Sequence, residues 1–161
     1  MRIYLPSTFA GLAAVLDAGE ISGPPLTAYA VTERLAGPDT AGDDEELEYE
    51  ALSGAAEASL RQLRDDPYPP RRRAVLAAEA PDAIIGPPPT GTGHPAAVTV
   101  TGTIPRKRIA AVHVDAPEAE EAVAAAIPGL GAGTGSEDDP LEEHELLWYA
   151  TQELPYLLGR A

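Results

Sequence analysis

The N-terminal part of the chain shows a short apolar run, a helical pattern and a second apolar run. The run Arg2–Leu5 is stopped by a proline and predicts a first strand. A hydroxyl group at Ser7 or Thr8 can then cap a helix that Gly19 ends. The apolar positions of this helix recur at helical spacing: Phe9, Leu12, Val15 and Leu16. The run Leu26–Thr32 predicts a second strand, and a strand–helix–strand segment of this length is typically a right-handed parallel crossover.

The longest helical pattern follows, from Asp43 or Asp44 to about Asp66. Acidic residues at its start suit the positive end of the helix dipole, and prolines after it end the helix. Its apolar positions are expected to face the core: Tyr49, Leu52, Ala56, Leu60 and Leu63.

Three further strands are predicted, at Ala74–Glu79, Ala97–Ile104 and Ile109–Val114. The second of them alternates strictly, which is typical of an antiparallel strand with one covered face. A short helix follows at Glu118–Ile127. The C-terminal segment shows a last helical stripe, at Leu147, Ala150, Leu154 and Leu157.

These elements occur in the order β-α-β-α-β-β-β-α-α. This order predicts an α/β fold, at the boundary with α+β, in which a mixed five-stranded sheet forms one domain over residues 1–161. We expect flexible Gly/Pro-rich insertions near residues 86–95 and 129–143. A chain of 161 residues fits one domain and can bury a core without a metal or disulfide.

The composition excludes several classes of chemistry. The chain contains no cysteine, which removes thiol nucleophiles, Cys-ligated zinc and iron–sulfur clusters. Its 26 acidic and 11 basic residues give a net charge of −15, which disfavours general nucleic-acid binding. No apolar run is long enough to span a membrane. We therefore expect a cytoplasmic protein.

Five segments together resemble a known family. They are RIYLP at the start, EELEYEAL in the long helix, RRRAVLAAEAP and RIAAVHVD around two strands, and HELLWYATQELPYLL near the end. This set is similar to an uncharacterised actinobacterial family of small proteins, a domain-of-unknown-function group. The resemblance implies a cytoplasmic actinobacterial protein and assigns no catalytic residue.

One group of candidate residues lies at the predicted carboxyl ends of strands. Ser7 and Thr8 follow the first strand, and His113 and Asp115 share one face at the end of the fifth. A hydroxyl, an imidazole and a carboxylate are the components of a hydrolase or transferase site. The alternative is that the hydroxyl groups only cap the helix, because no G-x-S-x-G motif is present.

The basic residues predict a binding surface. Six of them form two triplets, Arg71-Arg72-Arg73 and Arg106-Lys107-Arg108. If the three strands from Ala74 to Val114 form a meander, both triplets lie at one edge of the sheet, where Arg2 can join them. Such a patch suits an anionic small ligand, an acidic helix of a partner protein or the end of a nucleic acid. The alternative is that these side chains pair with the protein's own acids.

The C-terminal segment is a second candidate interface. Trp148, Tyr149, Gln152 and Tyr156 include the residue types that anchor protein–protein contacts. The alternative is that this helix packs on the sheet, and with one Phe and one Trp in the chain we expect Trp148 in the core. A homodimer that uses the alternating strand or the last helix is a further possibility.

Two other motifs were weighed against simpler interpretations. His144 with Asp139, Glu142 and Glu143 has ligand types for a divalent cation, although an acidic first turn of a helix explains them as well. The run Gly129–Gly135 lacks the residues of a phosphate loop and is interpreted as a linker. We therefore expect no metal and no cofactor. The leading hypothesis is a non-enzymatic binding or regulatory module with a protein partner.

Overall fold

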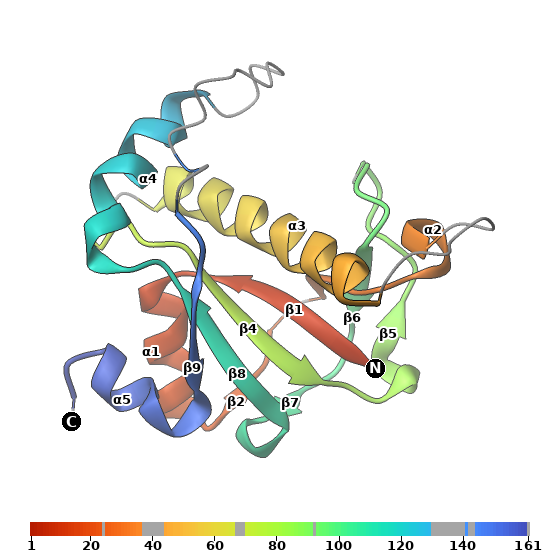
Figure 1. Ribbon diagram of the computed structural model, residues 1–161. Coiled ribbons are helices and arrows are strands. Elements are labelled where there is room, and N and C mark those ends of the chain that lie inside the picture. The colour runs from red at the N-terminus through yellow and green to blue at the C-terminus, as the bar shows by residue number, and fades with distance from the viewer. Residues whose placement is uncertain are drawn as a thin grey trace.

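The computed structural model describes residues 1–23, 25–36, 44–66, 70–91, 93–129, 141 and 144–160, which form a single α+β domain (Figure 1). Within them, seven strands form one sheet in the order β5-β6-β3-β1-β4-β8-β9, and a separate ribbon pairs β2 with β7. Every pair of neighbouring strands is antiparallel. The strands are β1 (Arg2–Ser7), β2 (Glu20–Ile21), β3 (Leu26–Tyr29), β4 (Ala74–Glu79), β5 (Ile85–Gly86), β6 (Ala97–Val100), β7 (Ile104–Pro105), β8 (Ile109–Val114) and β9 (Leu147–Ala150).

Helices cover both faces of the sheet. Figure 1 shows α3 lying along one face, where it contacts β1, β3 and β4. On the other face, α1 and the short α5 contact each other and pack on the main core cluster. The helices are α1 (Phe9–Ala18), α2 (Glu33–Ala36), α3 (Asp44–Asp65), α4 (Glu120–Ala126) and α5 (Leu154–Leu157). Single 3-10 turns precede β5, β8, α4 and α5, and another follows α4.

The two long predicted helices are confirmed. Thr8 is the residue that caps α1, and Gly19 ends the helix in the left-handed conformation, at φ 74°. The buried side of α3 is formed mainly by alanines such as Ala51 and Ala55, which let the helix lie close to the sheet. The predicted buried stripe is wrong at Tyr49, which is 59% exposed.

The predicted parallel crossover is wrong, because β1 and β3 are antiparallel and meet at Tyr4↔Tyr29. After α1 the chain enters the β2–β7 ribbon and turns back before it joins the sheet. The parallel strands are instead β3 and β4, which flank β1 and are connected through α3. The sheet is therefore antiparallel between neighbours rather than mixed, and it has more strands than predicted.

The predicted meander of the third, fourth and fifth strands is also wrong. The third and fifth of these, β4 and β8, pair directly, whereas β6 lies between β5 and β3. The predicted strand Ala97–Ile104 is split, because β6 ends at Val100 and Ile104 pairs with Ile21 of β2. Periodicity alone cannot indicate that a strand leaves one sheet for another.

The C-terminal stripe predicted as a helix is a strand over Leu147–Ala150, and helix α5 begins only at Leu154. The register Val112↔Tyr149 and His113↔Trp148 shows that β9 pairs with the edge of β8 that β4 leaves free. Aromatic residues such as Trp148 and Tyr149 favour strands. The backbone groups of β8 that β4 leaves unpaired provide hydrogen-bond partners for this segment, which a local sequence pattern cannot show.

The Gly/Pro-rich insertion near residues 86–95 connects β5 to β6, and its end is held by a 2.6 Å hydrogen bond from the Thr32 hydroxyl to the Pro95 carbonyl. Most of the second insertion, near 129–143, lies outside the described residues. In the part of the chain that the structure describes, no helix is long and apolar enough to span a membrane.

Candidate functional site

The two hydroxyl residues at the end of β1, Ser7 and Thr8, both lie against α1. The Thr8 hydroxyl accepts a hydrogen bond from the Gly11 amide at 3.1 Å and caps the helix. The Ser7 hydroxyl donates to the Thr8 carbonyl at 3.2 Å. A Cβ atom at Gly11 would lie 2.4 Å from the Ser7 hydroxyl oxygen, so this side chain fills the space that the glycine leaves.

His113 lies on the opposite face of the sheet. Its ring contacts Tyr4 edge to face, with the centroids 6.4 Å apart, on the side that α3 covers. Burial, together with the positive charge of Arg2, lowers the pKa of His113. Because Ser7 faces α1 and His113 faces the α3 side, the nucleophile and the base predicted for a hydrolase are not brought together.

Asp115 is fully buried and forms an ion pair with Arg73. Its carboxylate accepts two hydrogen bonds from the Arg73 guanidinium and one from the Arg73 amide, all at 2.8 Å. The same guanidinium donates to the carbonyl of His144 at 3.0 Å, just before β9. This geometry satisfies both charges internally, so Asp115 is held in place as a structural group.

The other two arginines of the first triplet also have partners within the chain. Arg71 donates to the Leu63 carbonyl at 2.7 Å, close to the C-terminal end of α3, where a cation is favourable. The Arg72 guanidinium lies 4.5 Å from the centre of the Phe9 ring and donates to the Asp115 carbonyl at 2.8 Å. Arg73 thus pairs with an acid, as the alternative interpretation expects, whereas the described contacts of Arg71 and Arg72 are with backbone carbonyls and an aromatic ring.

The single basic patch predicted from the meander is wrong. The first triplet precedes Ala74, which pairs with Val114 at the end of β8. The second triplet, Arg106-Lys107-Arg108, forms the 3-10 turn before β8, whose first residue Ile109 pairs with Ala78 near the end of β4. The triplets therefore lie at opposite ends of the β4–β8 pair, and Arg2, opposite Glu79, lies at the end of the second triplet.

The C-terminal candidates lie at and beyond the sheet edge formed by β9. Trp148 is 62% exposed, so the expectation that the core contains it is wrong. Tyr156 of α5 is 71% exposed, and Gln152 is exposed in the turn between them. Tyr149 is half-buried and packs against the main core. Leu147 and Trp148 of β9 are thus exposed, whereas Tyr149 and Ala150 are half-buried.

The outer edge of β9 has a defined backbone geometry. The Ala150 amide donates to the Glu153 carboxylate at 2.8 Å. In an antiparallel strand, residues two apart direct their backbone groups to the same side. The amide and carbonyl of Trp148 therefore point away from β8, as those of Ala150 do. Sequence analysis did not identify Glu153, although its position three residues after Ala150 is typical of a carboxylate that caps a turn.

A polar cluster lies on the α3 side of the sheet, on β1, β4 and α3. The Tyr4 hydroxyl donates to the Glu48 carboxylate at 2.5 Å, and Arg2 pairs with Glu79 at 2.5 Å. Burial, reinforced by Glu48, raises the pKa of the Tyr4 phenol well above its usual range. His113 connects this cluster to Trp148, its cross-strand neighbour.

A second group of titratable residues lines a cleft of about 590 Å³ between α3, β3 and the loop before β6. Arg61 pairs with Glu57 at 3.3 Å and donates a long hydrogen bond of 3.4 Å to the Tyr29 hydroxyl. His94 packs edge to face on Tyr29 and accepts a hydrogen bond from the Ala96 amide. Sequence analysis missed His94 because it lies in the Gly/Pro-rich insertion.

Of the residues considered for a cation, His144 is described, and Asp139, Glu142 and Glu143 lie outside the described part. Among the described residues, no three His, Asp or Glu side chains are grouped as metal ligands would be. All but the first residue of the run Gly129–Gly135 lies outside the described part as well.

Residues 1–158 match the model of a family of unknown function, DUF6912. The chain belongs to this family. Comparison with curated proteins and with solved structures finds no match. DUF6912 membership thus agrees with the resemblance to a family of unknown function and assigns no activity.

Proposed function

We propose that this DUF6912 protein is a binding module that receives an extended segment of a partner protein along the outer edge of β9. The supporting observation is the exposed Trp148 on the last strand of the sheet, with its backbone groups directed outward. An extended segment that adds a strand to such an edge gains main-chain hydrogen bonds, and exposed side chains give it specificity. Tryptophan is also among the residues that contribute most to protein interfaces.

The acidic residues that flank β9 along the chain favour a basic partner. Glu145 precedes the strand and Glu153 follows it, both are exposed, and the whole chain carries a net charge of −15. We therefore expect the bound segment to have an apolar centre flanked by Lys or Arg. Pairing of β9 with β9 of a second copy would instead bring these acids together, which is unfavourable.

Glu153 limits where the partner strand pairs. Its carboxylate already occupies the outward amide of Ala150, so the outward amide left for a partner on this strand is that of Trp148. A covered amide also protects part of the edge against indiscriminate pairing. The added strand is expected to centre on Trp148.

The test uses peptides selected from a random phage-display library on the wild-type protein, with affinities measured by fluorescence polarisation. Trp148→Thr removes the ring and keeps the amide, whereas Trp148→Pro also removes the outward donor and leaves the β8 ladder intact. Tyr49→Thr, which changes an exposed tyrosine on α3, is the matched control. We expect basic-flanked peptides that lose about tenfold in affinity for Trp148→Thr, more for Trp148→Pro, and little for the control.

Selected peptides that bind Trp148→Pro as tightly as wild type would refute strand addition at β9. Light scattering provides a second check. A wild-type dimer that becomes a monomer in Trp148→Pro would show that the occupant of the edge is a second copy of the chain, against the proposal.

A further inference from the structure

The sheet opens between β1 and β3 at one end. β1 pairs with β4 from Arg2↔Glu79 to Ser7↔Ala74, whereas among the described residues β1 meets β3 only at Tyr4↔Tyr29. The two strands then separate towards Ser7. This opening is independent of β9, which lies at the edge of the sheet beyond β4 and β8.

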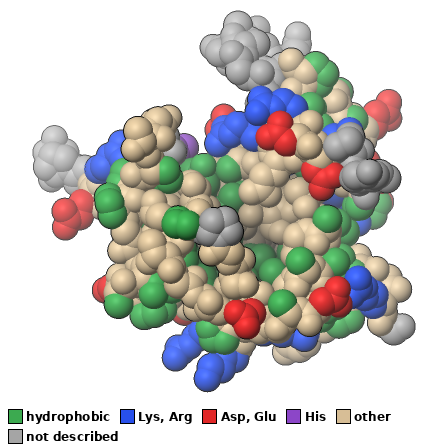
Figure 2. Space-filling model, turned by 180° about the vertical axis from the view of Figure 1, so that it is seen from behind, with side chains coloured by type: hydrophobic (Ala, Val, Ile, Leu, Met, Phe, Trp, Pro, Cys, Tyr) green, Lys and Arg blue, Asp and Glu red, His purple; other side chains and the backbone are tan. Residues whose placement is uncertain are grey.

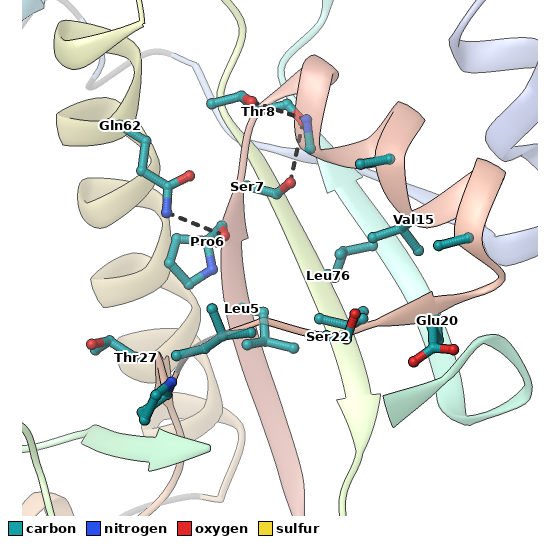
Figure 3. Close-up of a pocket in the computed structure, with 16 residues that line it drawn as sticks. Leu5, Pro6, Ser7, Thr8, Val15, Glu20, Ser22, Thr27, Gln62 and Leu76 are labelled. Carbon is teal, nitrogen blue, oxygen red and sulfur yellow. Dashed lines mark hydrogen bonds between the residues drawn. The ribbon is translucent and has the colours of Figure 1, made fainter. Parts of the chain in front are cut away.

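Pro6 explains why the strands separate. The Pro6 carbonyl accepts a long hydrogen bond of 3.4 Å from the Gln62 side chain of α3 (Figure 3). In a strand, the nitrogen and the carbonyl of one residue point to the same side. The N–H that Pro6 lacks would therefore have pointed to the same side as its carbonyl, which is the side towards β3. The ladder to β4 continues to Ser7, and the side towards β3 lacks a donor. The sequence pattern predicted that Pro6 would end the first strand. The strand instead continues to Ser7, and Pro6 opens the sheet between β1 and β3.

A cavity of about 490 Å³ lies at this opening. It is formed by the end of β1, by α1, by the segment between α1 and β3, and by Gln62. Along α1 the wall consists largely of small side chains, at Gly11, Ala14 and Ala18. Seen from behind, the molecule has a hollow whose visible walls are mostly uncharged (Figure 2). The volume is within the range of cavities that hold small organic ligands.

The lining combines apolar walls with neutral hydrogen-bonding groups. Leu5, Val15 and Leu76 supply apolar surface. Ser7, Ser22 and Thr27 supply hydroxyl groups, and Figure 3 shows these residues and Gln62 distributed around the cavity. Among the described residues that line it, Glu20 carries the one charge. The Pro6 carbonyl adds an acceptor whose present hydrogen bond is longer than the usual 2.7–3.2 Å.

We propose that this cavity binds a nucleoside, in which an uncharged amino-substituted heterocycle is attached to a sugar. The ring amino group would donate to the Pro6 carbonyl, and ring acceptors would face the Gln62 amide and the hydroxyl groups. The sugar hydroxyls suit the Glu20 carboxylate as an acceptor. A phosphate is excluded by chemistry, because the described lining offers it no Lys, Arg or His and places Glu20 beside it.

The test measures binding of adenosine and cytidine by isothermal titration calorimetry, with AMP and ribose as comparison probes. Ala14 and Ala10 are both exposed on α1, and Ala14 lines the cavity whereas Ala10 does not. Ala14→Leu therefore fills the cavity, and Ala10→Leu adds the same side chain elsewhere on the helix. We expect wild type to bind a nucleoside with a Kd of about 1 mM or tighter, and Ala14→Leu to weaken it by about tenfold or more.

Amide chemical shifts of the wild-type protein give a readout that does not depend on how a variant folds. On addition of adenosine, the shifts are expected to move at Gly11, Ser22 and Thr27. Thr27→Val, which removes one hydroxyl group, provides a second variant and should also weaken binding.

Four results would overturn the proposal. The first is that neither nucleoside binds at about 5 mM, five times the weakest expected Kd. The second is that Ala14→Leu and Ala10→Leu bind the nucleoside equally, and the third is that the chemical shifts move only in other parts of the chain. The fourth is that AMP or ribose binds more tightly than adenosine. The last would assign the cavity to an anion or to a simple sugar.

Discussion

The buried ion pair between Arg73 and Asp115 holds the start of β4 against the end of β8. Asp115→Asn keeps the shape of the side chain and leaves the Arg73 guanidinium, whose side chain is 11% exposed, without a carboxylate. Removing one partner of a buried ion pair typically costs about 3–5 kcal/mol, because the remaining charge is uncompensated. A domain of this size has a stability of about 5–15 kcal/mol, so the loss is a large share of the total.

Urea unfolding followed by circular dichroism measures this loss. With an m value of about 1–3 kcal/mol/M, a loss of about 3–5 kcal/mol is expected to lower the midpoint by roughly 1–5 M. Asp17→Asn is the matched control, because Asp17 pairs with Arg160 at 2.6 Å on the surface, where the two side chains are 65% and 45% exposed. An exposed pair contributes about 0–1 kcal/mol, so the control should change little.

A double variant separates charge from packing. Replacing Arg73 with Met and Asp115 with Leu removes both charges together, and the double variant should lose clearly less stability than the sum of the two single variants. The interpretation of Asp115 as a structural group would be refuted if Asp115→Asn shifted the midpoint no more than Asp17→Asn.

Three further outcomes are expected. Ser59→Ala, which removes a buried hydroxyl that joins the last carbonyl of β1 to the first amide of β4, should cost about 1–3 kcal/mol in urea unfolding. Burial lowers the pKa of His113 in the folded protein, so on acidification the unfolded chain binds a proton at this residue at a higher pH than the folded protein does. The wild type should therefore lose stability relative to His113→Gln as pH falls from about 7 to 5. Parallel profiles of stability against pH for the two proteins would contradict this. Gly54→Ala, whose Cβ atom would lie 2.9 Å from the Tyr29 ring, should destabilise by about 1–3 kcal/mol, whereas Ser53→Ala on the exposed side of the same helix should not.

Elements with strong local signals were predictable. Helix α1 has a capping threonine, a helical apolar spacing and a terminal glycine, and it was predicted with its ends nearly correct. The strands β4 and β8 were predicted over their full lengths, because each is a short apolar run bounded by polar residues or proline. In these segments local sequence and tertiary structure favour the same conformation.

The failures occurred where a distant segment determines the conformation. Leu147–Ala150 carries a helical spacing, yet the open edge of β8 makes it a strand. Pro6 lacks an N–H in any conformation. Only the pairing of β1 with β4 up to Ser7 shows that the missing donor opens the sheet on the side of β3 and does not end the strand. The periodicity of a sequence does not indicate the order of strands in a sheet. The prediction that the two basic triplets form one patch depended on a wrong strand order.

The candidate residues divide in the same way. The sequence by itself identified the residue types that carry charge or aromatic surface, since these are properties of single side chains. Arg73, Asp115, His113 and Trp148 were all selected on that basis. Only the tertiary structure decided their roles, because it pairs Arg73 with Asp115, separates His113 from Ser7 and leaves Trp148 exposed. The physical reason is that burial, pairing and accessibility depend on groups that lie far away along the chain.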